Sequence, residues 1–276
     1  MGVQRSYRGP LRAVILDWAG TAVDYGSFAP STVFLRLFAS RGVTVSMDDV
    51  RAGMGLMKQD HLRAILARPA VAAAWQAVHG EPATAADLEE LFASFVPLQR
   101  SVLADYADPI PGVLNALAEL RGRGIAIGST TGYLRAMMDV LAPAAAARGY
   151  TPDSLVCPDE VPAGRPAPWM CFQNAMRLGV YPMAALVKVG DTPVDMEEGV
   201  NAGMWTVGVT LTGSLLGQTR AEVERLTPAA RAAAHARIGD QLLAAGAHLV
   251  IEGAWALPQA IDALEARLRR GETPLV

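Results

Sequence analysis

The sequence predicts an α/β protein with a doubly wound parallel sheet and an inserted all-helical cap. Four apolar residues, Ala13 to Leu16, end abruptly at Asp17 and are followed closely by Gly20, which is typical of a buried parallel strand entering a turn. Between about residues 31 and 104 the apolar residues recur only at helical spacing. From Pro111 onward helices and strands alternate, a pattern that gives right-handed crossovers and a parallel sheet.

The helical stretch comes directly after the first strand. Pro30 suits the first turn of a helix that Gly42 ends, and Ser46 is typical of the N-cap of a second helix. Further helices are expected at 56–66, 71–79 and 85–104. We therefore expect residues 26–104 to form the cap, and residues 1–25 and 105–276 to form the α/β core.

The core segments follow in order. Helices are expected at 113–121, from about 133 to 148, at 169–178, at 229–245 and up to residue 270. Strands are expected at 125–130, 155–156, 185–191, 205–210 and 248–252.

Composition limits the class of protein. The chain has 276 residues, is 51% hydrophobic and carries a formal net charge of -3, which argues against an overall attraction to nucleic acid. Two cysteines are too few for a disulfide framework. The first residues lack the apolar core of a signal peptide, and no apolar run is long enough to span a bilayer. We expect a cytoplasmic protein that binds neither nucleic acid nor membrane.

Polar groups follow three of the predicted strands: Asp17, the pair Ser129-Thr130, and Asp191. In a parallel sheet these ends lie on one edge, so the groups can converge. Two aspartates there would repel each other unless a cation or a proton lies between them, and oxygen ligands on a rigid scaffold suit Mg²⁺. Thr130 and Arg165 could hold a phosphate group while one aspartate attacks phosphorus. Each residue alone also has a simple structural explanation, such as a turn or a solvated charge.

Four segments, DWAGT, GSTTGY, GRP and VGDTPVDM, resemble the four motifs of the haloacid dehalogenase superfamily of phosphoryl-transfer enzymes. The resemblance implies that Asp17 is the nucleophile. It also implies a Mg²⁺ ion held by Asp17, the main-chain carbonyl of Ala19 and Asp191, with Asp195 in support.

The sequence departs from the phosphatases of this superfamily at Ala19. Those enzymes have an aspartate at this position, two residues after the nucleophile, which protonates the leaving oxygen. Alanine cannot donate a proton, so an ordinary alkoxide would leave unassisted. The leaving group therefore needs no acid here, or the protein is a poor phosphatase.

The cap contains a lysine, Lys58, whose chemistry would make an acid at position 19 unnecessary. Lys58 and His61 are three residues apart and therefore share a helical face, near Met54 and Met57. Burial over an apolar pocket would lower the pKa of Lys58, and a neutral amine condenses with an aldehyde to an imine. Cleavage of a neighbouring P–C bond then leaves an enamine, and no oxygen needs a proton. The alternative is a solvent-facing lysine and a surface histidine.

A larger set of six segments resembles the Schiff-base phosphonatases of the same superfamily: DWAGT, DYGSFAP, MGLMKQDH, GSTTGY, EVPAGRPAPW and AGMWTVGVTLTG. The resemblance implies hydrolysis of a small phosphonate, phosphonoacetaldehyde, to acetaldehyde and phosphate. It implies an imine on Lys58, proton transfers assisted by His61, and a homodimer formed through the cap. Its other implied site residues are Met54, Gly55 and Tyr133 lining the pocket, and Arg165 with Thr130 or Thr131 binding the phosphonate.

Two alternatives remain open from the sequence. The first keeps the fold but is a phosphate-monoester phosphatase or sugar-phosphate mutase. The second is a non-catalytic relative that senses phosphate or acts as a scaffold. In addition, Ser27 occupies a position where some phosphonatases carry cysteine, which leaves the role of that position open.

Overall fold

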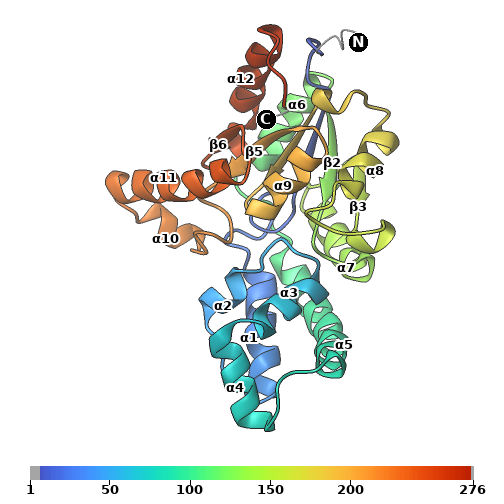
Figure 1. Cartoon of the computed structure of the whole chain (residues 1–276). Coiled ribbons are helices and arrows are strands. Elements are labelled where there is room, and N and C mark those ends of the chain that lie inside the picture. The colour runs from blue at the N-terminus through green and yellow to red at the C-terminus, as the bar shows by residue number, and fades with distance from the viewer. Residues whose placement is uncertain (1–6, 275–276) are drawn as a thin grey trace.

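The structure is a computed structural model that describes residues 7–274. Figure 1 shows two bodies, an α/β core and a bundle of helices below it. The core sheet has six parallel strands in the order β3-β2-β1-β4-β5-β6. Its strands are β1 (Ala13–Leu16), β2 (Ala126–Thr130), β3 (Ser154–Val156), β4 (Leu186–Gly190), β5 (Trp205–Val209) and β6 (Leu249–Ile251).

Helices cover both faces of the sheet, as the doubly wound prediction requires. Along β1, Ala13 and Ile15 belong to the apolar cluster on one face, and Val14 and Leu16 to the cluster on the other. This alternation is the period of a strand buried on both sides. The core helices are α6 (Val113–Gly122), α7 (Arg135–Ala146), α8 (Trp169–Leu178), α9 (Pro193–Asn201), α10 (Arg220–Glu224), α11 (Pro228–Ala244) and α12 (Leu257–Arg269).

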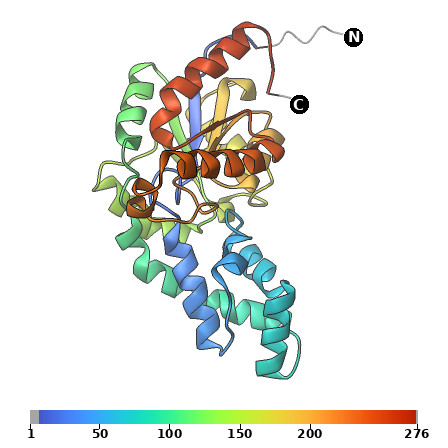
Figure 2. The same cartoon turned by 90° about the vertical axis from the view of Figure 1, so that its left-hand side faces the viewer.

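The cap is helical throughout. It contains α1 (Phe28–Ser40), α2 (Met47–Arg51), α3 (Lys58–Leu66), α4 (Pro69–His79) and α5 (Ala85–Val102), and Figure 2 shows the same separation from the side. Ser46 caps α2 by accepting a hydrogen bond from the Asp49 N–H, which agrees with its predicted role.

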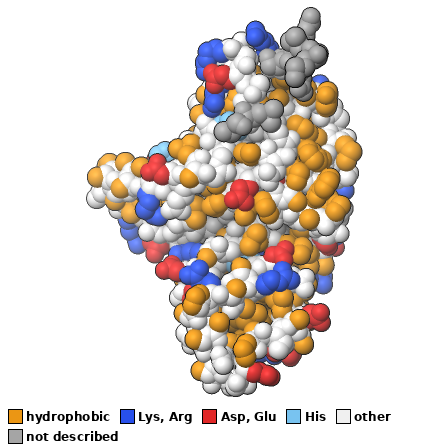
Figure 3. All heavy atoms as spheres, in the orientation of Figure 1, with side chains coloured by type: hydrophobic (Ala, Val, Ile, Leu, Met, Phe, Trp, Pro, Cys, Tyr) orange, Lys and Arg blue, Asp and Glu red, His pale blue; other side chains and the backbone are white. Residues whose placement is uncertain are grey.

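Cap and core also touch each other closely. One apolar cluster runs from the sheet into the cap. The guanidinium of Arg51 in α2 donates to the carbonyl of Gly217 in the core at 2.7 Å. In Figure 3, acidic and basic side chains lie next to each other at the level where the two bodies meet.

Two short helices are missing from the sequence prediction, α9 and α10. Both begin at capping threonines, Thr192 and Thr219, but each is too short for an apolar period to stand out. A second difference is that α7 begins at Arg135 and not near Tyr133. Tyr133 is therefore in the loop between β2 and α7.

No helix among residues 7–274 combines the length and the apolar character that crossing a membrane requires.

We predict that Phe34→Ala lowers the free energy of unfolding by about 3–5 kcal/mol, because it empties a fully buried position of the cap. The Phe34 ring packs on Phe95, with 4.5 Å between the centroids, and on His61 at 4.2 Å. Denaturant unfolding measures the change. Val78→Ala at a half-exposed cap position should change stability by less than about 0.5 kcal/mol. Equal effects of the two variants would contradict the prediction.

Candidate active site

Asp17 lies where β1 ends, at the edge of the sheet. Its N–H donates to the carbonyl of Val189 at 2.9 Å, which continues the pairing of β1 with β4 and fixes the position of the side chain. The chain then turns sharply at Gly20, which has a φ of 86°. A Cβ at Gly20 would lie 2.9 Å from a carboxylate oxygen of Asp191, so only glycine allows this approach.

Three aspartates meet at this edge, between β1 and β4, where the strand order reverses. Carboxylate oxygens of Asp17, Asp191 and Asp195 all lie within 4.8 Å of one another. Asp191 follows β4 and accepts hydrogen bonds from the N–H and Oγ of Ser214 at 2.7 and 2.9 Å. Asp195 lies in the first turn of α9 and accepts from the Thr192 hydroxyl at 2.5 Å. The sequence prediction that the strand ends converge is thus confirmed.

The electrostatics of these carboxylates suit a divalent cation. Burial, together with the charges of Asp17 and Asp195, raises the pKa of Asp191 to about 7. Burial also raises the pKa of Asp17. Burial opposes ionisation of Asp195 as well, but Arg165 and Lys188 outweigh it and hold its pKa low. Hard oxygen donors with uncompensated negative charge are what a divalent cation binds.

Arg165 reaches the aspartates from the loop before α8. Its Nη2 donates to Asp17 Oδ1 at 2.7 Å and to Thr130 Oγ1 at 2.8 Å. Its Nη1 forms a 2.9 Å ion pair with Asp195, and its Nε donates to Glu198 at 3.0 Å. The guanidinium is 1% exposed and stays charged, because neighbouring carboxylates raise its pKa in spite of burial.

Lys58 brings an amine from the cap to the same place. It is the first residue of α3 and only 4% exposed, so the alternative of a solvent-facing lysine is wrong. Its Nζ lies 4.9 Å from the ring centroid of Tyr133. Burial lowers the pKa of Lys58 to about 8, although Asp17 opposes the shift. The preceding cap loop fits tightly, since a Cβ on Gly55 would lie 2.5 Å from Thr192 Oγ1.

The chain has only two lysines, and the second is Lys188 in β4. Its Nζ donates to Asp195 at 2.7 Å and to Thr130 at 3.0 Å, and it pairs with Glu198 at 3.2 Å. Burial and Arg165 oppose its charge, but the carboxylates outweigh them and raise the pKa of Lys188. Lys188 is therefore held as an ammonium ion, and Lys58 is the one lysine with a lowered pKa.

His61 occupies the cap interior and not the cavity. Its Nε2 donates to the Val50 carbonyl at 2.6 Å, and its Nδ1 is buried and has no hydrogen-bond partner among residues 7–274. Burial and the charge of Lys58 lower its pKa to about 3, so the ring is neutral. The alternative of a surface histidine is wrong, because His61 is fully buried. Its role in proton transfer remains a prediction, and this structure gives it no contact with the cavity.

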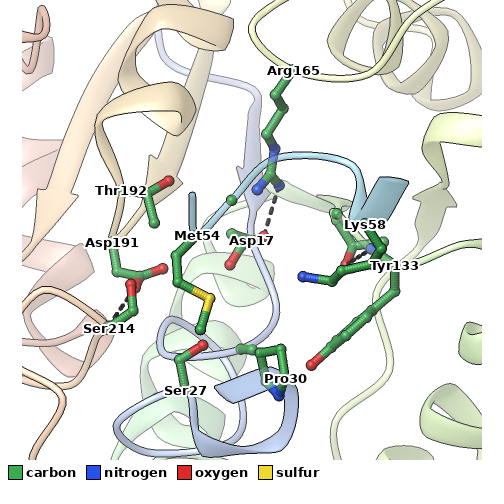
Figure 4. Close-up of a pocket in the computed structure, with 14 residues that line it drawn as sticks. Asp17, Ser27, Pro30, Met54, Lys58, Tyr133, Arg165, Asp191, Thr192 and Ser214 are labelled. Atoms are coloured by element: carbon green, nitrogen blue, oxygen red, sulfur yellow. Dashed lines mark hydrogen bonds and ion pairs between the residues drawn. The ribbon is translucent and has the colours of Figure 1, made fainter. Parts of the chain in front are cut away.

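Residues of both cap and core line a small cavity around Asp17 and Lys58 (Figure 4). In Figure 4, Arg165 points at Asp17 from one side, and the Lys58 amino group approaches from another. Nine of the predicted site residues line the cavity: Asp17, Ala19, Met54, Gly55, Lys58, Thr131, Tyr133, Arg165 and Asp191. The other lining residues are Ser27, Pro30, Gly132, Thr192 and Ser214.

Two further predicted residues, Thr130 and Asp195, lie behind the cavity wall. Thr130 is fully buried, and its hydroxyl donates to Glu198 at 3.1 Å. Of the two threonines considered for phosphonate binding, Thr131 is the one that faces the cavity. Met57 lines a neighbouring opening with Asp60 and Pro158.

Sequence reasoning passed over Lys188 and Glu198, which bind Arg165, Thr130 and Asp195 together. A signal for Lys188 was present, because a lysine inside a fully apolar strand must be paired with an acid.

These features define a hydrolase site of the haloacid dehalogenase type: an aspartate at the end of β1, a carboxylate pair after β4 and a buried arginine. Residues 11–203 match the haloacid dehalogenase-like hydrolase family, and the chain belongs to it.

Individual proteins of known name are similar to this chain over nearly its whole length. The phosphonoacetaldehyde hydrolase of Nitratidesulfovibrio vulgaris is 49% identical over 98% of this chain and 96% of the relative. That of Bacillus cytotoxicus is 51% identical over 92% of this chain and 97% of the relative. The crystal structure of a phosphonoacetaldehyde hydrolase-like protein from Oleispira antarctica matches with a TM-score of 0.96 at 36% identity and covers 99% of both chains.

We predict that Asp191→Asn weakens divalent-cation binding by at least about tenfold, because it removes one carboxylate from the donor set. Titration with Mn²⁺ followed by electron paramagnetic resonance measures the affinity. Asp240→Asn, at an exposed position of α11, is the control and should bind as the unmodified protein does. Undiminished binding to the Asp191 variant would place the cation elsewhere.

Proposed function

We propose that this protein hydrolyses the P–C bond of phosphonoacetaldehyde to give acetaldehyde and phosphate. The observation that carries the proposal is the position of Lys58, a buried amine of lowered pKa that lines the same cavity as Asp17. The names of the relatives at about half identity support the same reaction.

The first half of the proposed reaction belongs to Lys58. Its neutral amine adds to the aldehyde carbon, and uptake of a proton from solvent with loss of water gives a protonated imine. The imine nitrogen then accepts the electron pair of the breaking P–C bond, which leaves an enamine. No leaving oxygen has to be protonated in this step, and this agrees with an alanine at position 19. Protonation of the enamine carbon and hydrolysis of the imine release acetaldehyde and restore the amine.

The second half belongs to Asp17. Its carboxylate attacks phosphorus as the P–C bond breaks and forms an aspartyl phosphate, which water then hydrolyses. Arg165 Nη2 contacts Asp17 at 2.7 Å, which supports the proposal that Arg165 stabilises the charge on the transferring group. Thr131 lines the cavity nearby and is proposed to bind the phosphonate.

We propose Mg²⁺ as the cation, held by Asp17, Asp191 and the main-chain carbonyl of Ala19, with Asp195 in support. When bound, it would neutralise charge on the carboxylates and on the phosphoryl oxygens. We further propose a homodimer and a cytoplasmic location, as the resemblance and the low cysteine count suggest.

A phosphate-monoester phosphatase or a sugar-phosphate mutase is the alternative. Both would need an acid near the leaving oxygen, and Ala19 supplies none. Neither would use the amine of Lys58.

We predict that borohydride with phosphonoacetaldehyde fixes one adduct on Lys58 and none on Lys188, since carboxylates hold Lys188 as an ammonium ion. Peptide mass spectrometry locates the adduct. Lys58→Arg should form no adduct, because a guanidinium forms no imine. Its rate of phosphate release should be lower by at least about 1000-fold. Full turnover by this variant, or indifference of the unmodified protein to borohydride, would contradict the proposal.

We also predict the pH dependence of adduct formation with acetaldehyde. The pKa of Lys58 is lowered to about 8, so the fraction of Lys58 in the neutral form grows as pH rises toward that value. Well above pH 8 nearly all of the amine is neutral. The trapping rate should rise about tenfold per pH unit below pH 8 and then level off. The N-terminal amine is labelled in the same sample and provides an internal comparison. A rate that continues to rise to the usual lysine pKa would contradict a lowered pKa at Lys58.

A further inference from the structure

Glu198 is a buried acid of α9 that lines no part of the cavity. It is fully buried, whereas its neighbour Glu197 on the same helix is exposed. A buried carboxylate costs several kcal/mol unless cations and hydrogen bonds compensate it. The position of Glu198 in a helix therefore does not by itself explain why its carboxylate is buried.

One oxygen of Glu198 holds three other groups. Its Oε2 accepts from Arg165 Nε at 3.0 Å and from the Thr130 hydroxyl at 3.1 Å, and it pairs with Lys188 Nζ at 3.2 Å. Its Oε1 is buried and has no hydrogen-bond partner in the described part of the chain. All three contacts of Glu198 are thus made by one oxygen, which holds the Nε of Arg165.

The guanidinium of Arg165 is planar and rigid, so fixing one edge sets the direction of the others. Glu198 holds Nε, and Asp195 pairs with Nη1. The remaining group, Nη2, then points at Asp17. Lys188 pairs with both supporting acids, so Arg165 does not compensate their charge alone.

We propose that Glu198 is a positioning residue for the phosphoryl-transfer half of the reaction. It holds Arg165 in the orientation from which Nη2 reaches Asp17 and the transferring group. This inference rests on the proposed function, and it concerns Asp17 and not Lys58. The two halves of the reaction should therefore respond differently to its loss.

The test is Glu198→Gln, with Glu197→Gln as the matched control. The amide keeps the shape of the side chain but removes its charge. Phosphate release from phosphonoacetaldehyde should fall about 10- to 100-fold in kcat, as expected for a displaced catalytic group. The acetaldehyde adduct at Lys58, trapped with borohydride, should form as in the unmodified protein. Glu197→Gln should change neither readout.

Trapping at Lys58 also reports that cap and core are folded together. If Glu198→Gln does not fold, Glu198→Asp keeps the charge but shortens the reach, and the same pattern is expected. Full phosphate release by the folded variant would overturn the proposal. Equal loss of phosphate release and of trapping would also overturn it, because that result indicates a general structural role.

Crystal structures separate this proposal from the proposed function. Arg165 should contact Asp17 in the unmodified protein and turn away in Glu198→Gln. An unchanged contact would overturn the positioning role whichever substrate the enzyme takes. By contrast, an unmodified protein that forms no imine and releases no phosphate from phosphonoacetaldehyde would refute the proposed function alone.

Discussion

The active site depends on the burial of charge at one edge of the sheet. Asp17, Asp191, Asp195 and Glu198 are removed from solvent in one small volume, with Arg165 and Lys188 among them. Such a cluster is stable only when every charge meets a fixed partner. The parallel sheet supplies that order, since main-chain pairing of β1 with β2 and β4 fixes the relative positions of the strand ends.

The four carboxylates outnumber the two basic residues among them, and the negative charge that remains explains how core and cap divide the chemistry. In the proposed reaction the core offers what phosphorus requires: a nucleophilic carboxylate, a cation site and an arginine. The cap offers what an aldehyde requires, an amine kept partly neutral by burial. An amine among these carboxylates would stay protonated, and Lys188 is the example. Lys58 approaches from the cap side, where it lies over the Tyr133 ring, and burial lowers its pKa although Asp17, Asp191 and Asp24 oppose the shift (Figure 4).

Much of this arrangement could be predicted from the sequence, because strand ends and the Gly-rich turn after Asp17 have local signatures. The contacts of single side chains could not. Thr130 and Thr131 are neighbours at a strand end, and the alternation of an extended chain turns one to the network and the other to the cavity. Helical spacing predicts that His61 and Lys58 share one helical face. The His61 side chain instead turns into the cap interior, where Phe34 packs on it. Glu198 gave no signal because most helical glutamates are solvated.

The scarcity of lysine completes the electrostatic argument. Of 24 basic Lys and Arg residues, two are lysines, and both are buried at this site. Arginine stays charged at any ordinary pH and forms no imine, so the surface of this chain presents no lysine amine to an aldehyde. One of the two lysines is held as a cation by Asp195 and Glu198. An aldehyde that reaches the cavity therefore meets a single lysine of lowered pKa, Lys58, and this lysine lines the same cavity as Asp17, the proposed nucleophile.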